Sequence, residues 1–142
     1  MRITKEADYA LRICLCLARH GTSMATNSIA AETGLSRSYT TQILRTLTLA
    51  GITSGKQGNG GGYSLTHTPD TISIGTLIEA IDGEIAIVGC LRCTEPCSQY
   101  GERTYACPMQ TYFSELNNDL RTELHRTMLS AFLSDSAHAA LY

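Results

Sequence analysis

The sequence predicts a mainly α-helical fold with one small β-hairpin. Apolar residues recur at every third or fourth position through most of the chain, and glycines follow several of these stretches as stop signals. One short glycine-dense segment near residue 60 is instead flanked by residues that alternate as in strands. At 142 residues the chain is long enough for one domain with its own core and an appended long helix.

The first helix is predicted over residues 4–20 and ends at Gly21. Cys14 belongs to its apolar face, so we expect a small buried side chain there rather than a metal ligand. The complete apolar face is Ala7, Ala10, Leu11, Cys14, Leu17 and Ala18.

Two helices joined by a tight glycine-containing turn are predicted next, at about 27–33 and 37–50. Asn27 or Ser28 is the expected cap of the first, and Ser36 is the cap of the second. This arrangement is typical of a helix-turn-helix, whose second helix enters the major groove of DNA. The apolar face of the second helix is Tyr39, Ile43, Leu44, Leu47 and Ala50.

A β-hairpin is predicted directly after this pair of helices. Residues 52–54 form a short strand, residues 55–62 include five glycines, and residues 63–66 alternate as a returning strand. The glycine segment lacks the Gly-Lys-Ser/Thr ending of a nucleotide phosphate loop, and no helix follows it. The sequence therefore predicts a winged helix-turn-helix.

Two further helices are predicted, at 72–82 and from 108 to 133. The apolar face of the second is long enough to favour packing against another copy of the chain. We accordingly divide the chain into a DNA-binding domain (1–83), a cysteine-rich loop (84–108), and a dimerisation helix with its tail (109–142). The apolar face consists of Phe113, Leu116, Leu120, Leu124, Met128 and Ala131.

Four cysteines, Cys90, Cys93, Cys97 and Cys107, lie within eighteen residues. The N-terminus lacks the apolar core of a signal peptide, and no apolar run is long enough to span a membrane, so we expect a cytoplasmic protein. Clustered cysteines in that compartment are metal ligands or redox centres more often than disulfides. Soft thiolates favour iron–sulfur clusters or zinc.

The charge is distributed unevenly. Residues 1–66 carry seven Lys or Arg and three Asp or Glu, a net +4, whereas residues 67–142 carry four and ten, a net −6. A basic half is the minimum expected of a surface that binds nucleic acid.

Five segments together resemble the Rrf2 family of winged-helix transcription regulators, which includes IscR and NsrR. They are the opening Met1–Arg12, Leu35-Ser-Arg-Ser-Tyr39, Leu49-Ala-Gly-Ile52, Gly60-Gly-Gly-Tyr63 and Ile78-Glu-Ala-Ile-Asp-Gly83, in the family's order. The resemblance implies a homodimer whose long C-terminal helices cross, and a [2Fe-2S] or [4Fe-4S] cluster held by three cysteines. It implies a repressor that senses nitric oxide, redox state or iron–sulfur status.

By position, the resemblance assigns Cys90, Cys97 and Cys107 to the three cysteine ligands of the family. The fourth ligand stays open between Cys93 and Asp8, the latter supplied by the other subunit as in NsrR-like members. No histidine follows Cys107 closely, so the chain resembles NsrR more than IscR.

The partner is expected to be double-stranded DNA with a palindromic operator, and no small-molecule substrate is expected. Arg37 and Gln42 are candidates to read bases, and Arg2, Arg45 and Lys56 to contact phosphates. The glycine-rich wing is expected along the minor groove. The complete candidate set is Arg2, Ser36, Arg37, Ser38, Tyr39, Thr40, Thr41, Gln42, Arg45, Lys56, Gly60 and Gly61.

Three alternatives compete with this interpretation. A regulator of the same fold could use thiol oxidation or zinc in place of a cluster. A thiol-disulfide oxidoreductase could use Cys90-Leu-Arg-Cys93, but the chain lacks the strand–helix alternation of that fold, so no enzyme is expected. A protein-binding module would use the same basic half without binding DNA.

Overall fold

A computed structural model describes residues 3–92, 99 and 107–133. It confirms the predicted class, mainly helical with one two-stranded antiparallel sheet. None of the described helices is long and apolar enough to cross a membrane. The elements are α1 (Lys5–His20), α2 (Thr26–Thr33), α3 (Arg37–Leu49), β1 (Thr53–Lys56), β2 (Gly62–Leu65), α4 (Ile74–Asp82), η1 (Gly89–Leu91), α5 (Pro108–Arg126) and η3 (Leu129–Phe132).

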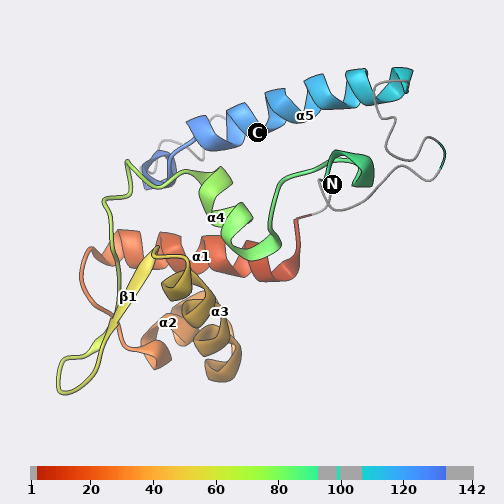
Figure 1. Ribbon diagram of the computed structural model, residues 1–142. Helices are drawn as coiled ribbons and strands as arrows, with labels where there is room; N and C mark the ends of the chain where they lie inside the picture. Colours follow the sequence, from red (N-terminus) through yellow and green to blue (C-terminus); the bar gives the residue numbers. More distant parts are fainter. Residues whose placement is uncertain (1–2, 93–98, 100–106, 134–142) are drawn as a thin grey trace.

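Helix α1 lies at the centre of the molecule (Figure 1). Helices α2 and α3 pack on one side of it, and α4 packs on the other. Helix α5 lies beyond α4, and the β-hairpin extends from the α2–α3 side. The α3–wing side and α5 are therefore at opposite ends of the structure.

Local sequence signals explain where α1 begins and ends. The Thr4 hydroxyl accepts a hydrogen bond from the backbone N–H of Ala7 at 3.2 Å, which caps the first turn. Gly21 ends the helix in a left-handed conformation with φ of 66°. Cys14 is buried as predicted, and Cys16 is also buried. The buried residues of α1 are Ala7, Ala10, Ile13, Cys14, Cys16 and Leu17.

The helix-turn-helix forms as predicted, with one correction at the start of α2. Ser36 caps α3 by accepting from the N–H of Tyr39 at 3.3 Å. The cap position of α2 is occupied by Ala25, so the prediction of Asn27 or Ser28 is wrong. The preceding residue is held extended by its pairing with the hairpin, and the helix begins as soon as that pairing ends.

The hairpin pairs Thr53 with Leu65 and Lys56 with Gly62. Met24 adds to its edge, because its N–H donates to Tyr63 O at 2.9 Å and its carbonyl accepts from Tyr63 N at 2.8 Å. A Cβ at Gly62 would lie 2.3 Å from the Met24 carbonyl oxygen, so this close approach requires glycine. The wing is thus joined to the segment between α1 and α2.

The last helix is shorter than predicted, because α5 ends at Arg126 rather than at 133. Thr127 is extended, and its carbonyl accepts from Ile74 N at 2.9 Å. Leu129 N donates to Ile72 O at 2.8 Å, and the Leu129 side chain is buried. These contacts with the segment before α4 replace the last helical turns, so Met128 and Ala131 do not lie on the α5 face.

Two leucines on α3 test this packing. Leu44 is fully buried, whereas Leu49 is 90% exposed. Leu44→Ala should lower the free energy of unfolding by about 2–5 kcal/mol, because it leaves a cavity in the core. Leu49→Ala, the matched control, should change it by less than about 0.5 kcal/mol. Equilibrium urea denaturation measures both, and equal losses would contradict the orientation of α3.

Candidate functional site

The outward face of α3 is polar and lines an open groove. Its inward face is used by the core through Ile43, Leu44 and Leu47. Because a helix repeats every 3.6 residues, burying this stripe leaves the opposite stripe in solvent. The groove-lining residues are Arg37, Ser38, Thr41, Gln42, Arg45, Thr46 and Leu49.

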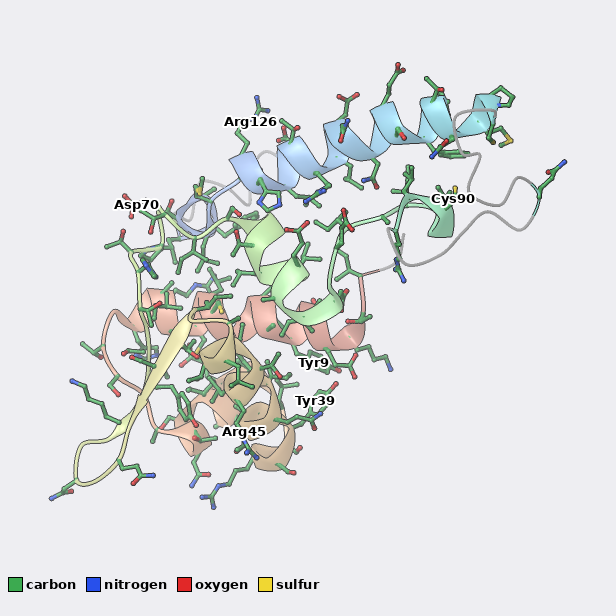
Figure 2. All side chains as sticks on the ribbon, in the orientation of Figure 1. Tyr9, Tyr39, Arg45, Asp70, Cys90 and Arg126 are labelled. Carbon is green, nitrogen blue, oxygen red and sulfur yellow. The ribbon has the colours of Figure 1, made fainter. Side chains whose placement is uncertain are left out.

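A second groove runs from α3 to the wing and shares Arg45 and Leu49 with the first. Figure 2 shows Arg45 at the side of the molecule opposite α5. Among the described residues that line the two grooves, Arg37, Arg45 and Lys56 are cationic and none is acidic. The surface is therefore a continuous basic trough between a helix and a hairpin, suited to a polyanion.

The wing tip is a compact backbone loop. Gly60 has φ of 78°, a conformation that favours glycine. A Cβ at Gly61 would meet the Lys56 carbonyl oxygen at 2.4 Å. The glycines at the predicted wing positions therefore permit a tight turn, and the exposed Lys56 side chain projects beside it.

Thr40 is the member of the predicted DNA-binding set that the structure moves away from the surface. It is fully buried, and its hydroxyl donates to the Ser36 carbonyl at 2.9 Å. The expectation that Thr40 is exposed is wrong, because it lies on the same helical stripe as the core residues of α3. The predicted residue Arg2 lies outside the described residues.

Tyr39 has a bonded position between two helices. Its hydroxyl donates to Glu6 Oε1 at 2.8 Å, and its ring stands edge-on to Tyr9 with centroids 5.5 Å apart. The hydrogen bond to Glu6 raises the pKa of Tyr39 to about 12 and lowers the pKa of Glu6. Tyr39 therefore joins the start of α3 to α1, and Ser36 likewise uses its hydroxyl within the fold as a cap.

The structure adds residues that the sequence did not single out. Thr26, Thr46, Leu49 and Gln57 line the grooves beside the predicted set. The exposure of Leu49 could have been predicted from the sequence, because this apolar residue does not lie on the apolar stripe of its own helix. The other three are polar residues whose position follows only from the way α2, α3 and the wing meet.

Two of the four cysteines in the cysteine-rich loop, Cys90 and Cys107, are among the described residues. Cys90 lies in η1 and Cys107 is the N-cap of α5, and both are half-buried free thiols. Figure 2 shows Cys90 beneath the N-terminal half of α5, and η1 contacts that helix. Cys93 and Cys97 lie outside the described residues. Two free thiols at the two ends of the cysteine cluster supply soft donors that fit a metal or iron–sulfur ligand set.

Asn117 fixes the approach to Cys90 and was not predicted. This buried side chain accepts from Ile87 N at 2.9 Å and donates to Ile85 O at 3.0 Å. Both bonds attach the chain just before η1 to α5. A polar residue in a helix is expected at the surface, so this role could not be predicted from the sequence.

Asp8 lies on α1 with its side chain 48% exposed. Arg12, one turn later, holds its carboxylate at 2.8 Å. Such an exposed ion pair contributes only about 0.3–0.5 kcal/mol to the stability of the fold. A metal centre can therefore replace Arg12 as the partner of the Asp8 carboxylate at small cost. Asp8 is therefore accessible from outside the protomer.

Comparisons with known proteins give a family and a fold. The Rrf2 family model, described as an iron-dependent transcriptional regulator, matches residues 3–135. The HTH-type transcriptional regulator IscR of Vibrio vulnificus is 31% identical over 138 residues, covering 96% of this chain and 79% of that protein. The HTH-type transcriptional repressor NsrR of Streptomyces coelicolor is 33% identical over 93 residues, 63% of each chain.

Among solved structures, CymR, the global cysteine regulator of Bacillus subtilis, superposes with a TM-score of 0.74. It is 26% identical, and the match covers 99% of this chain and 98% of CymR. The predicted winged helix-turn-helix class is thereby confirmed.

Proposed function

Because the chain belongs to the Rrf2 family of transcriptional regulators, we propose that it is a DNA-binding repressor whose operator binding is controlled by an iron–sulfur cluster. Two predictions from the sequence are confirmed, the family and the absence of an enzymatic function, since the relatives are transcriptional regulators. The operator, the dimer, the cluster and its signal belong to the proposal.

The basic trough between α3 and the wing is the observation that carries this proposal. It places three cations, Arg37, Arg45 and Lys56, along one surface without an acidic residue among the described lining residues. Phosphate neutralisation by such side chains supplies most non-specific affinity for DNA. Both grooves are open to solvent, as a surface that receives duplex DNA has to be.

Base reading is assigned to the exposed N-terminal part of α3. Arg37 can donate two hydrogen bonds to guanine, and Gln42 can pair with adenine. Ser38 and Thr41 lie on the same face and are short enough to let the helix approach the bases. Thr40 is left out of this set because it is buried.

Arg45, Lys56 and the backbone at Gly60 and Gly61 are assigned to the sugar–phosphate backbone and the minor groove. Arg45 of α3 lines both grooves, so it lies where the helix meets the wing. Arg2 remains a predicted phosphate contact.

The dimer is supported by the exposed apolar residues of α5. Met109 is 62% exposed, Tyr112 is 62% exposed and Leu116 is 44% exposed, and their spacing places them on one side of the helix. Such a stripe favours burial against a second copy. A two-fold dimer would present two α3 helices to half-sites separated by about 34 Å, one turn of DNA.

Cys90, Cys97 and Cys107 are the proposed cysteine ligands of the cluster. When bound, the cluster supplies chemistry that is sensitive to nitric oxide, oxygen and iron status. Asn117 positions Cys90 by holding the preceding backbone on α5, and Pro108 begins the helix directly after Cys107. The positive end of the α5 dipole thus faces the ligand at Cys107.

The fourth ligand is assigned to Asp8 of the partner subunit, with Cys93 as the alternative. The exposure of Asp8 supports ligation from outside its own protomer. A link between α1 of one protomer and the cysteine segment of the other would hold the two α3 helices at a fixed separation. Loss of the link would release that separation and reduce operator affinity.

Arg37→Ala tests the assignment of base reading. The substitution should cost about 1–3 kcal/mol in operator binding and relax specificity at one base step. Arg126→Ala removes an exposed guanidinium on α5 and serves as the matched control, with operator affinity unchanged. Electrophoretic mobility shifts against operator and scrambled DNA measure both. A loss that is equal on all sequences would reassign Arg37 to a phosphate contact.

Cys107→Ser tests the ligand set. The wild-type protein purified without oxygen should show broad visible absorbance with matching iron and sulfide, and Cys107→Ser should lose both. Cys14→Ala is the control, because Cys14 is a buried thiol of α1 outside the cysteine segment. A colourless wild-type protein that contains zinc, or no metal, would contradict the cluster and leave the DNA-binding assignment standing.

A further inference from the structure

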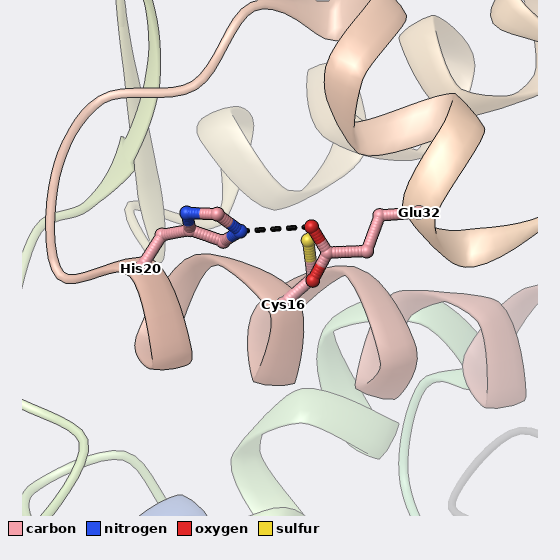
Figure 3. Close-up of side chains that lie close together, drawn as sticks. All are labelled: Cys16, His20 and Glu32. Carbon is pink, nitrogen blue, oxygen red and sulfur yellow. Dashed lines mark hydrogen bonds and ion pairs between the residues drawn. The ribbon is translucent and has the colours of Figure 1, made fainter.

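A second group of metal-binding side chains lies away from the cysteine-rich segment. Cys16 and His20 are one turn apart on α1, and Glu32 faces them from α2 (Figure 3). Their three candidate donor atoms all lie within 4.8 Å of one another. The proposed DNA-binding and cluster assignments use none of these residues.

The geometry needs little adjustment to hold one ion. His20 Nε2 and Glu32 Oε2 are 2.8 Å apart, joined in a hydrogen bond. In a tetrahedral zinc site, bond lengths of about 2.0–2.3 Å place neighbouring donors about 3.4–3.6 Å apart. The side chains of His20 and Glu32 are 46% and 43% exposed, so both can rotate by this small amount without disturbing the core.

The site has a buried sulfur at its base and an open side. Cys16 is only 4% exposed and comes from within the core face of α1. The thioether of Met24 lies 3.7 Å from the Cys16 sulfur. Figure 3 shows the Cys16 sulfur beside the Glu32 carboxylate, and the Glu32 and His20 side chains are both half-exposed to solvent. An ion can therefore enter from solvent and keep one position for water.

We propose that Cys16 Sγ, a ring nitrogen of His20 and a carboxylate oxygen of Glu32 bind one zinc-class divalent cation. Sulfur, imidazole and carboxylate are the ligand types that zinc accepts together. Binding breaks the His20–Glu32 hydrogen bond and releases the Cys16 thiol proton to solvent. Burial, the main cause, raises the pKa of Cys16 to about 11, so this proton release makes the site weaker than a preformed thiolate site.

A bound ion would join the last turn of α1 to α2, the first helix of the helix-turn-helix. Met24, beside the site, also pairs with the wing through Tyr63. The three ligands are absent from the described lining of both grooves. The ion would therefore stabilise the scaffold of the DNA-binding domain without occupying the face that contacts DNA.

The test uses the full chain with Cys90, Cys93, Cys97 and Cys107 changed to serine, which removes competing thiols. Zinc titration against a chromophoric chelator should give one zinc per chain, and cobalt should give a thiolate charge-transfer band. His20→Ala should weaken binding at least about tenfold, since even outer-shell partners of metal ligands cost ~10–100-fold when removed. His67→Ala, another exposed histidine, should leave binding unchanged.

Thermal unfolding gives a second readout, because an ion that binds only the folded state raises the melting temperature. Zinc should raise it in the parent and in Cys14→Ala, and raise it much less at the same zinc concentration in Cys16→Ala or His20→Ala. Absence of bound zinc, or equal binding by His20→Ala, would overturn the proposal and leave His20 and Glu32 as a surface ion pair only.

If the four-serine chain does not fold, the wild-type protein decides the question by its zinc content. His20→Ala should then hold one zinc fewer per chain than the wild type, and equal content would overturn the proposal. Either failure leaves the iron–sulfur proposal intact, because the two sites share no residue.

Discussion

Burial of one face of α1 is the interaction on which the rest of the structure depends. Ala10, Ile13 and Cys14 of this helix are fully buried, and α1 contacts α2, α3, α4, β2 and η3. The alanine lets a neighbouring helix approach closely, and the larger side chains exclude water from the contact. Because α3 uses its own apolar stripe against this centre, only its polar stripe can face outward.

Hydrogen bonds hold α3 in place relative to the wing. Ile52 N donates to Leu47 O at 2.9 Å, and the hydroxyls of Thr48 and Thr53 are 2.9 Å apart. On the other side, Met24 holds the returning strand through Tyr63. The two parts of the basic trough are therefore joined by hydrogen bonds on both sides of the hairpin, which favours a preformed DNA-binding surface.

Much of this arrangement could be predicted from local signals. The apolar spacing in α1 and α3, the Ser36 cap and the glycines of the wing act within a few residues, and the structure confirms them. The end of α5 could not be predicted, because hydrogen bonds to Ile72 and Ile74, far away in the sequence, replace the helix there. The burial of Asn117 could not be predicted for the same reason, since its hydrogen-bond partners lie about thirty residues earlier in the chain.

The site was predicted in part. Arg37, Gln42, Arg45 and Lys56 lie together on the surface, whereas Thr40 faces the core because the helical period places it with the apolar stripe. The ligand set of the cysteine segment depends on residues outside those described and on a second protomer, so it stays a prediction.

Selection of bound sequences from a random pool of duplex DNA tests the central claim, that α3 and the wing form a sequence-reading surface presented twice by a dimer. The claim predicts strong enrichment of a two-fold symmetric sequence whose half-sites are about one helical turn apart. Recovery of a pool no different from the input would contradict it.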